Sequence, residues 1–247
     1  MAVVFLCGAE CGRAGTGLHW DTLGTGWSFT AVSPITGARS LRYNPSATSG
    51  LTSATAANSD VVHRIVVRFD TLPDADTLLS SMGTTTGRAG VVFKQSDGKI
   101  YAGHVAAGVF LIGATGVAVT TATRYFIDCK VDGTGNVVDV QVSGTAAGQF
   151  SNAVVAGIGN LLSLGGNTSI TADIYYDDVR GDNALAAYPI GDGYVNHFVP
   201  TADGTHNVAG AADFRRGGTT TDILNTTTNA YLLVDDVPLD DVTPDTD

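Results

Sequence analysis

Glycoside hydrolysis is the first chemistry to test against the sequence, because retaining glycosidases need two carboxylates about 5 Å apart. The chain has 24 acidic residues, but Glu10 is its only glutamate and no pair of aspartates is marked out by spacing. No Ser-His-Asp order, phosphate-binding loop or dinucleotide fingerprint is present. The sequence therefore predicts no catalytic residues and a protein that is not an enzyme.

The densest set of oxygen ligands is Asp177, Asp178, Asp182 and Asn183, at the end of a predicted strand and in the loop after it. Calcium takes six to eight oxygen ligands, so this tract could supply several of them. The alternative is that strand-end aspartates cap a turn or pair with an arginine, here Arg180. Calcium at this tract is the one cofactor that the sequence suggests, and otherwise we expect none.

Aromatic rings are the side chains on which a sugar could stack. The candidates for ligand binding are Trp20, Tyr176, Tyr188 and Tyr194. Tyr175 and Tyr176 point to opposite faces of one strand, so one of them is expected in the core and the other outside. The competing interpretation is that all of these rings fill the core or a subunit contact.

These residues lie on short segments in which apolar and polar residues alternate with period two, a pattern typical of half-buried strands. Turn residues predict three hairpins, at Ser96–Gly98, at Asp132–Gly135, and at Gly165–Asn167 between Leu161–Leu164 and Ile170–Val179. The other predicted strands are 27–32, 40–43, 63–69, 109–112 and 194–199.

Composition agrees with a β protein. Glycine is abundant, at 31 residues, while glutamate and lysine, which helix surfaces usually carry, are nearly absent. We therefore predict an all-β fold, an antiparallel two-sheet jelly-roll sandwich with little helix, over residues 1–200. Residues 201–247 are predicted to form a C-terminal extension that docks and leads into a linker, since Tyr231–Val234 is followed by six aspartates and two prolines.

Alternation in the segment Tyr125–Val131 gives a register prediction. Tyr125, Ile127, Cys129 and Val131 should share the buried face, and Phe126, Asp128 and Lys130 should lie on the wetter face. Cys129 is then an inert core thiol. A Cys7–Cys11 bridge and two buried reduced thiols both remain open for the other cysteines.

The formal net charge of −11 argues against a nucleic-acid partner, because an acidic body repels phosphate. No stretch approaches the roughly 20 apolar residues of a membrane span, so no membrane partner is expected. The start MAVVFLC has no basic residue and a short apolar run, so we expect no signal peptide.

Several tracts resemble a known family. They are Gly8–Glu10 followed by Trp20, Gly37–Arg42, Arg124–Ile127 with its Val-Asp-Gly hairpin, and Ala172–Val179 followed by Tyr188–Val195 and Pro200–Gly204. In this order they resemble the concanavalin A-like, laminin G-like jelly rolls of bacteriophage structural proteins.

The resemblance implies a non-enzymatic virion structural protein, either a tail or fibre component or a head-decoration component. Its implied partners are other virion proteins and further copies of itself in a homo-oligomer, and its implied location is the virion. The alternative is a carbohydrate-binding adhesin that recognises host-surface glycans, because the fold family also holds lectins and sugar-binding modules.

Overall fold

The structure, a computed structural model, describes a large part of the chain up to residue 190. The described residues are 3–7, 23–32, 34–35, 39–45, 51–54, 60–83, 87–155, 161–165 and 170–190. For residues 3–7 and 51–54 the description is of the backbone alone. The predictions for Trp20, Tyr194, the Cys7–Cys11 bridge and the extension 201–247 concern residues or side chains outside this description.

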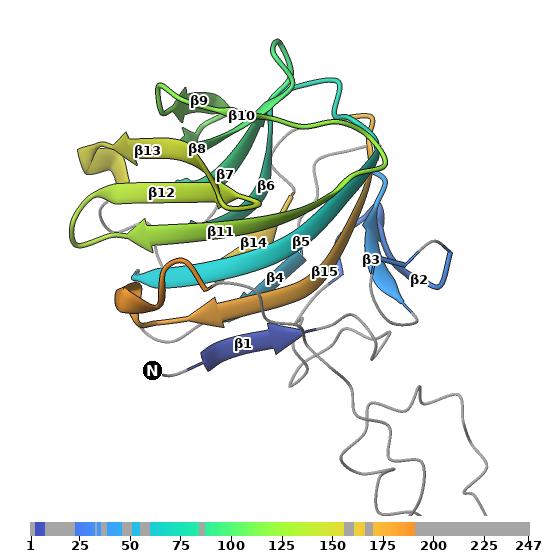
Figure 1. Ribbon diagram of the computed structural model, residues 1–247, viewed down its shortest axis with the longest axis horizontal. Coiled ribbons are helices and arrows are strands. Elements are labelled where there is room, and N and C mark those ends of the chain that lie inside the picture. The colour runs from blue at the N-terminus through green and yellow to red at the C-terminus, as the bar shows by residue number, and fades with distance from the viewer. Residues whose placement is uncertain are drawn as a thin grey trace, which may run out of the picture. The chain divides into compact units, whose positions relative to one another are not determined.

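One of the two sheets, here called sheet A, carries the longest strands (Figure 1). Its order is β13 (Thr145–Ser151), β12 (Val137–Val142), β11 (Arg124–Asp132), β5 (Val61–Thr71), β15 (Asp173–Asp182), β3 (Ser40–Tyr43) and β2 (Trp27–Thr30), and β1 (Val3–Cys7) also pairs with β15. Every pairing in it is antiparallel.

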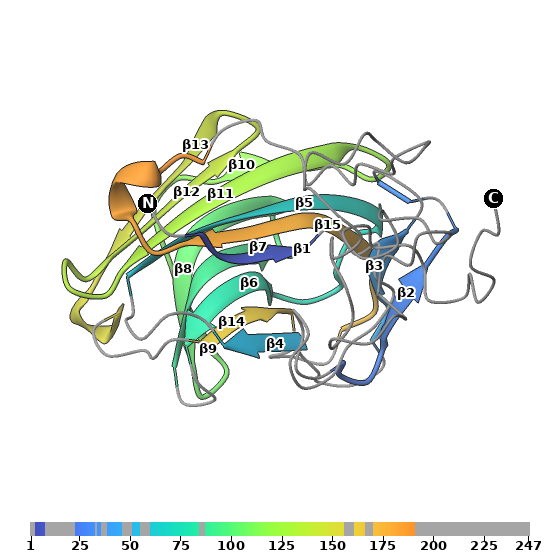
Figure 2. The same ribbon diagram turned by 90° about the horizontal axis from the view of Figure 1, so that it is seen from below.

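Sheet B is the second layer of the sandwich and lies against sheet A (Figure 2). Its order is β10 (Val117–Ala118), β8 (Lys99–Ala106), β7 (Arg88–Lys94), β6 (Thr77–Gly83), β14 (Leu161–Leu164) and β4 (Leu51–Ala54), and β9 (Val109–Ile112) also pairs with β8. Its pairings are antiparallel as well.

Helix in the described residues is limited to two short 3-10 turns, η1 (Ala153–Val155) and η2 (Leu185–Ala187). The predicted two-sheet antiparallel sandwich with little helix is therefore confirmed, and it is consistent with a jelly roll. Across the described part of the chain, no helix is long and apolar enough to cross a membrane.

The core fills the space between the inner faces of the two sheets. In β11, Ile127, Cys129 and Val131 have no solvent exposure, and Tyr125 packs against them from the edge of the core. This confirms the register predicted from alternation, because a shift of one residue would have placed Phe126 and Asp128 inside instead.

The predicted hairpins have different outcomes. The turns after Lys94 and after Asp132 join β7 to β8 and β11 to β12, as predicted. The third hairpin is wrong: β14 pairs with β4 and β6 in sheet B, whereas β15 pairs with β5 in sheet A. The chain crosses from one sheet to the other between these strands, and a glycine-rich connection does not distinguish such a crossing from a hairpin.

A histidine links the two sheets inside the core. His63 of β5 lies opposite Cys129 in sheet A, and its Nε2 is 2.9 Å from the Ser80 hydroxyl of sheet B. The imidazole has no solvent exposure, and this burial lowers the pKa of His63 to about 4. The ring is therefore neutral at neutral pH, and the hydrogen bond spans an apolar interior.

Acid should weaken the fold through His63. Between pH 6.5 and about 4 the unfolded chain binds a proton at this imidazole that the folded chain excludes, so the unfolding free energy should fall as the pH falls. The loss at pH 4 should reach about 3 kcal/mol. Urea unfolding of the protein and of His63→Gln at pH 7, 5.5 and 4 measures it. Equal pH slopes in both proteins would contradict this account.

Cys129 should resist alkylation in the folded protein. The side chain is fully buried, and burial raises the pKa of its thiol well above the usual range. Iodoacetamide needs the thiolate and physical access, so modification of Cys129, followed by peptide mass spectrometry, should proceed only through unfolding. Urea should make the reaction complete within minutes. Rapid native labelling would show that β11 has another register.

Candidate functional site

A pocket of about 330 Å³ opens on the outer face of sheet A, within the size range of small-molecule sites. Its described lining residues come from three adjacent strands, one turn and the segment after β15. They are Arg64, Phe126, Asp128, Gln141, Ser143, Gly144 and Pro189.

Strand register brings the polar lining residues together. Asp128 of β11 lies directly opposite Arg64 of β5 on one side and Gln141 of β12 on the other. All three point away from the core, because on each strand the residues next to them in sequence point inward. A row of guanidinium, carboxylate and carboxamide groups therefore crosses the pocket floor.

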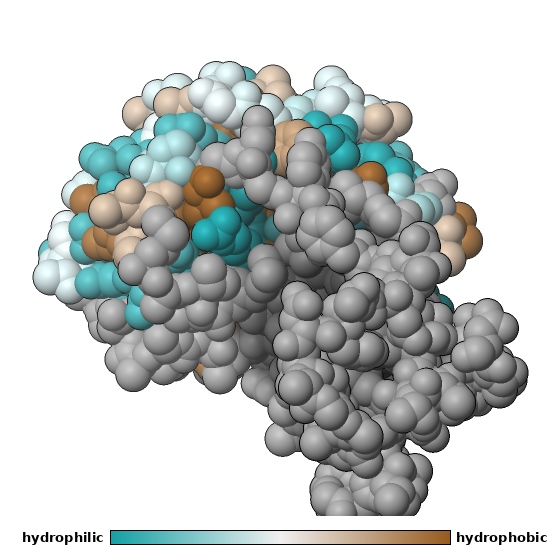
Figure 3. Space-filling model, turned by 60° about the horizontal axis from the view of Figure 1, so that its bottom comes forward, coloured by the Kyte–Doolittle hydropathy of each residue, from teal (hydrophilic) through white to brown (hydrophobic). Residues whose placement is uncertain are grey.

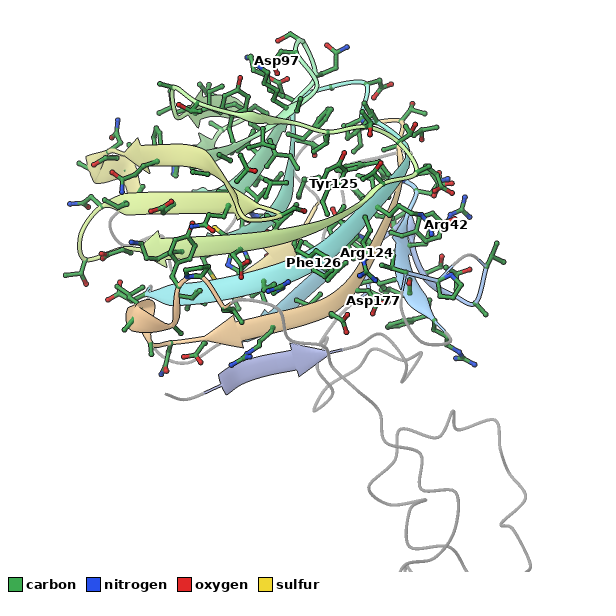
Figure 4. All side chains as sticks on the ribbon, in the orientation of Figure 1. Arg42, Asp97, Arg124, Tyr125, Phe126 and Asp177 are labelled. Carbon is green, nitrogen blue, oxygen red and sulfur yellow. The ribbon has the colours of Figure 1, made fainter. Side chains whose placement is uncertain are left out.

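Arg64 is nearly fully buried although it lies on the outer face. Its Nη1 is 3.8 Å from Oδ2 of Asp128, and its guanidinium carbon is 4.8 Å from the ring centroid of Phe126. The guanidinium carbon of Arg124 is 4.7 Å from the same centroid (Figure 4). The ring thus holds two cations by cation–π attraction, and it restricts their positions.

A tight turn closes the pocket at the end of β12. Ser143 and Gly144 both have positive φ, 48° and 80°, as a two-residue hairpin turn of type I′ requires. The Ser143 N–H donates to the carbonyl of Phe126 at 2.6 Å, and the Ser143 hydroxyl accepts from the Phe126 N–H at 3.3 Å. The turn is therefore fixed against β11, beside the aromatic ring.

The segment after β15 forms the remaining wall. The hydroxyl of Tyr188 donates to Asp139 at 3.0 Å, and the Ile190 N–H donates to Asp128 at 3.1 Å. Lys130 lies over the Tyr188 ring, with Nζ 5.4 Å from its centroid. Burial and then the negative charge of Asp139 raise the pKa of Tyr188, so the phenol stays neutral. These bonds hold Pro189 at the pocket.

The arrangement suits hydrogen bonding to a small polar ligand. The guanidinium and carboxamide offer donors, and the carboxylate, carboxamide and hydroxyl offer acceptors, in positions fixed by the strands. Phe126 and Pro189 add apolar contact. Among the described lining residues only Asp128 is a carboxylate, so the two-carboxylate arrangement of glycosidases is not formed by them.

The aromatic residues predicted to bind a ligand lie in the core, in the pocket wall or outside the described residues. Tyr176 is fully buried, and its ring lies 5.3 Å from that of Trp27 in the core, so it offers no surface to a sugar. Tyr175 faces outward, as the alternation predicts, but the guanidinium of Arg68 covers it at 4.5 Å. Tyr188 supports the wall of the pocket through its hydroxyl.

The predicted calcium ligands do not form a metal group. Among the described residues, no three acidic, histidine or cysteine side chains come together as a metal site. Asp177 accepts from the Ser40 hydroxyl at 3.1 Å. Asp182 accepts from the Ala184 N–H at 2.9 Å and lies 3.8 Å from Arg180, which is the turn-capping and ion-pairing alternative. Asp178 lies at a β-bulge with φ of 43°.

Sequence reasoning did not select the pocket residues as a site. The alternation places Phe126 and Asp128 on the wetter face of β11, and that signal was present. Their meeting with Arg64 and Gln141 depends on the register between strands far apart in sequence, which alternation does not provide.

Comparison with known proteins gives fold relatives only. The chain matches no protein-family model and no curated protein by sequence. Among solved structures, domain 4 of AbnA, a GH43 extracellular arabinanase from Geobacillus stearothermophilus in complex with arabinotriose, has a TM-score of 0.53. The two share 16% identity, over 72% of this chain and 91% of that domain.

A second similar structure is the binding domain of Paraclostridial Mosquitocidal Protein 1, with a TM-score of 0.50 and 15% identity. The match covers 73% of this chain and 48% of that one, so this chain spans about half of that solved chain. At these identities the likeness shows the β-sandwich fold alone.

Two tyrosines provide a matched test of the wall. Tyr188→Phe removes a hydrogen bond to Asp139 and should lower the unfolding free energy by about 1 kcal/mol. Tyr176→Phe should leave the unfolding free energy unchanged or slightly raised, because the buried Tyr176 hydroxyl has no hydrogen-bond partner among the described residues. Chemical denaturation of both variants measures the difference. A larger loss in Tyr176→Phe than in Tyr188→Phe would contradict these assignments.

Proposed function

We propose that this chain is a carbohydrate-binding β-sandwich that holds a saccharide in the pocket on the outer face of sheet A and catalyses no reaction. The observation that carries the proposal is the row of Arg64, Asp128 and Gln141 across the pocket floor. Such planar side chains pair donors and acceptors with adjacent sugar hydroxyls in fixed directions.

The fold comparison supports the same class of ligand. The domain of similar fold from the arabinanase was solved with arabinotriose bound, and nearly all of that domain corresponds to this chain. A sandwich of this kind can therefore serve as a saccharide-binding unit. The ligand site proposed for this chain rests on its own residues, because 16% sequence identity is too low to transfer residue roles from that domain.

The absence of catalysis is part of the proposal. Asp128 lies 3.8 Å from Arg64 and accepts the Ile190 N–H, and it is the one carboxylate among the described lining residues. Glycoside hydrolysis needs a second carboxylate beside the first, and the described lining residues supply none. We expect the protein to bind saccharides without shortening them.

The setting we propose is the surface of a virion, where such a module would attach to host glycans. This setting is supported by the resemblance of the tracts from Ala172 to Gly204 to phage structural proteins. This setting combines the two roles expected from the sequence. Contacts outside the pocket would attach the module to other virion proteins, and the pocket would bind glycans of the host surface. Detection of the chain in purified particles by mass spectrometry tests the setting.

Gln141 gives the sharpest test of the pocket. We expect a glycan array to identify at least one bound oligosaccharide, and Gln141→Ala to weaken its binding about tenfold by removing two hydrogen-bonding groups. Gln149→Ala removes the same side chain from β13, where the residue is exposed and does not line the pocket. It should bind like the unmodified protein.

Isothermal titration calorimetry with the best array ligand compares the three proteins. Equal affinity in the unmodified protein and Gln141→Ala, or no bound oligosaccharide on the array, would overturn the proposed function. Shortening of the ligand, followed by chromatography, would overturn its non-catalytic part.

A further inference from the structure

Positive side chains on the outer face of sheet A are, with one exception, paired with aspartates among the described residues. This pairing nearly cancels the charge over the sheet. The pairs are Arg42 with Asp173 at 2.6 Å, Arg68 with Asp70 at 3.1 Å, Arg64 with Asp128 at 3.8 Å, Arg180 with Asp182 at 3.8 Å and Lys130 with Asp139 at 4.0 Å.

Arg124 is the exception in the described part of this face. Its side chain is exposed, and its one described partner is the ring of Phe126, a lining residue of the pocket. In the view of Figure 3, hydrophilic and hydrophobic residues are mixed over the described surface. Arg124 therefore brings an uncompensated positive charge to the rim of the pocket.

Two arginines lie next to Arg124, and each already has an aspartate partner. Arg124 lies directly opposite Arg68, which pairs with Asp70. Its guanidinium shares the Phe126 ring with that of Arg64. An anion that binds at Arg124 displaces no described aspartate, and a guanidinium binds carboxylates and sulfates through two parallel hydrogen bonds.

Resting on the proposed function, we propose that the bound saccharide is anionic, and that Arg124 binds its carboxylate or sulfate group at the rim of the pocket. The sugar hydroxyls then meet Asp128 and Gln141 on the floor. Phe126 fixes the guanidinium for this contact, so less side-chain freedom is lost on binding than for an unsupported surface arginine.

Two matched pairs of probes test the ligand charge by calorimetry. Trigalacturonic acid is compared with its fully methyl-esterified form, and lactose 3′-sulfate is compared with lactose. At least one anionic probe should bind tenfold or more tightly than its neutral match, because a hydrogen bond to a charged group contributes more binding free energy than one between neutral groups. The pair that shows the difference identifies the group as a carboxylate or a sulfate.

Arg124→Gln should remove that difference and leave the affinity for the neutral probe unchanged. Arg124→Lys should keep part of it, since lysine retains the charge and lacks the planar fork. Lys99→Gln removes the same charge from β8 in sheet B and serves as the control for net charge. It should bind all four probes like the unmodified protein.

The outcomes separate this inference from the proposed function. If array ligands bind and depend on Gln141, but neither pair differs or the difference survives in Arg124→Gln, the anionic inference is overturned and the saccharide site stands. If no saccharide binds, the proposed function itself fails. A preference for the anionic probe that Lys99→Gln also abolishes would assign it to overall charge and overturn the role of Arg124.

Discussion

A guanidinium group shielded from water on an outer sheet face is the constraint on which the candidate site depends. Arg64 retains only 2% of its possible exposure, and a buried charge is costly unless polar and aromatic groups replace its water. Strand β11 supplies both replacements, the carboxylate of Asp128 and the ring of Phe126, since residues two apart share a face. The segment around Pro189 covers this cluster, so the pocket is shaped by the requirement to keep one charge satisfied.

The core and the site are opposite faces of the same strands. β11 hides Ile127 and Cys129 and therefore has to present Phe126 and Asp128 on its other side. A slip of one residue would bury a carboxylate between the sheets and expose the apolar set, which apolar burial strongly opposes. Burial of the apolar face therefore also fixes the positions of the polar side chains on the opposite face of the same strand.

The predictable part of this molecule is the part that local pattern controls. Alternation gave the faces of β11, and Asp-Gly turns gave two hairpins, because each depends on residues adjacent in sequence. Strand Thr77–Gly83 is buried along its whole length, so its apolar and polar residues do not alternate. Alternation therefore does not predict this strand. The predicted pairing of β14 with β15 failed because sheet choice is a tertiary property. Tyr176 was predicted as a binding residue, but it lies on the face of β15 that packs into the core.

Charge organises the surface at two different ranges. A chain of net charge −11 repels anions in general, but salt at physiological ionic strength screens exposed charges beyond about 8 Å. Whether an anion binds a particular guanidinium then depends on the groups next to that guanidinium. Most cations on sheet A already form an ion pair with an aspartate. Selectivity for an anionic sugar would follow from this difference, since the paired arginines are already satisfied and Arg124 is not. A mostly neutralised face with a single open cation discriminates better than a uniformly basic face, which would bind polyanions of every kind.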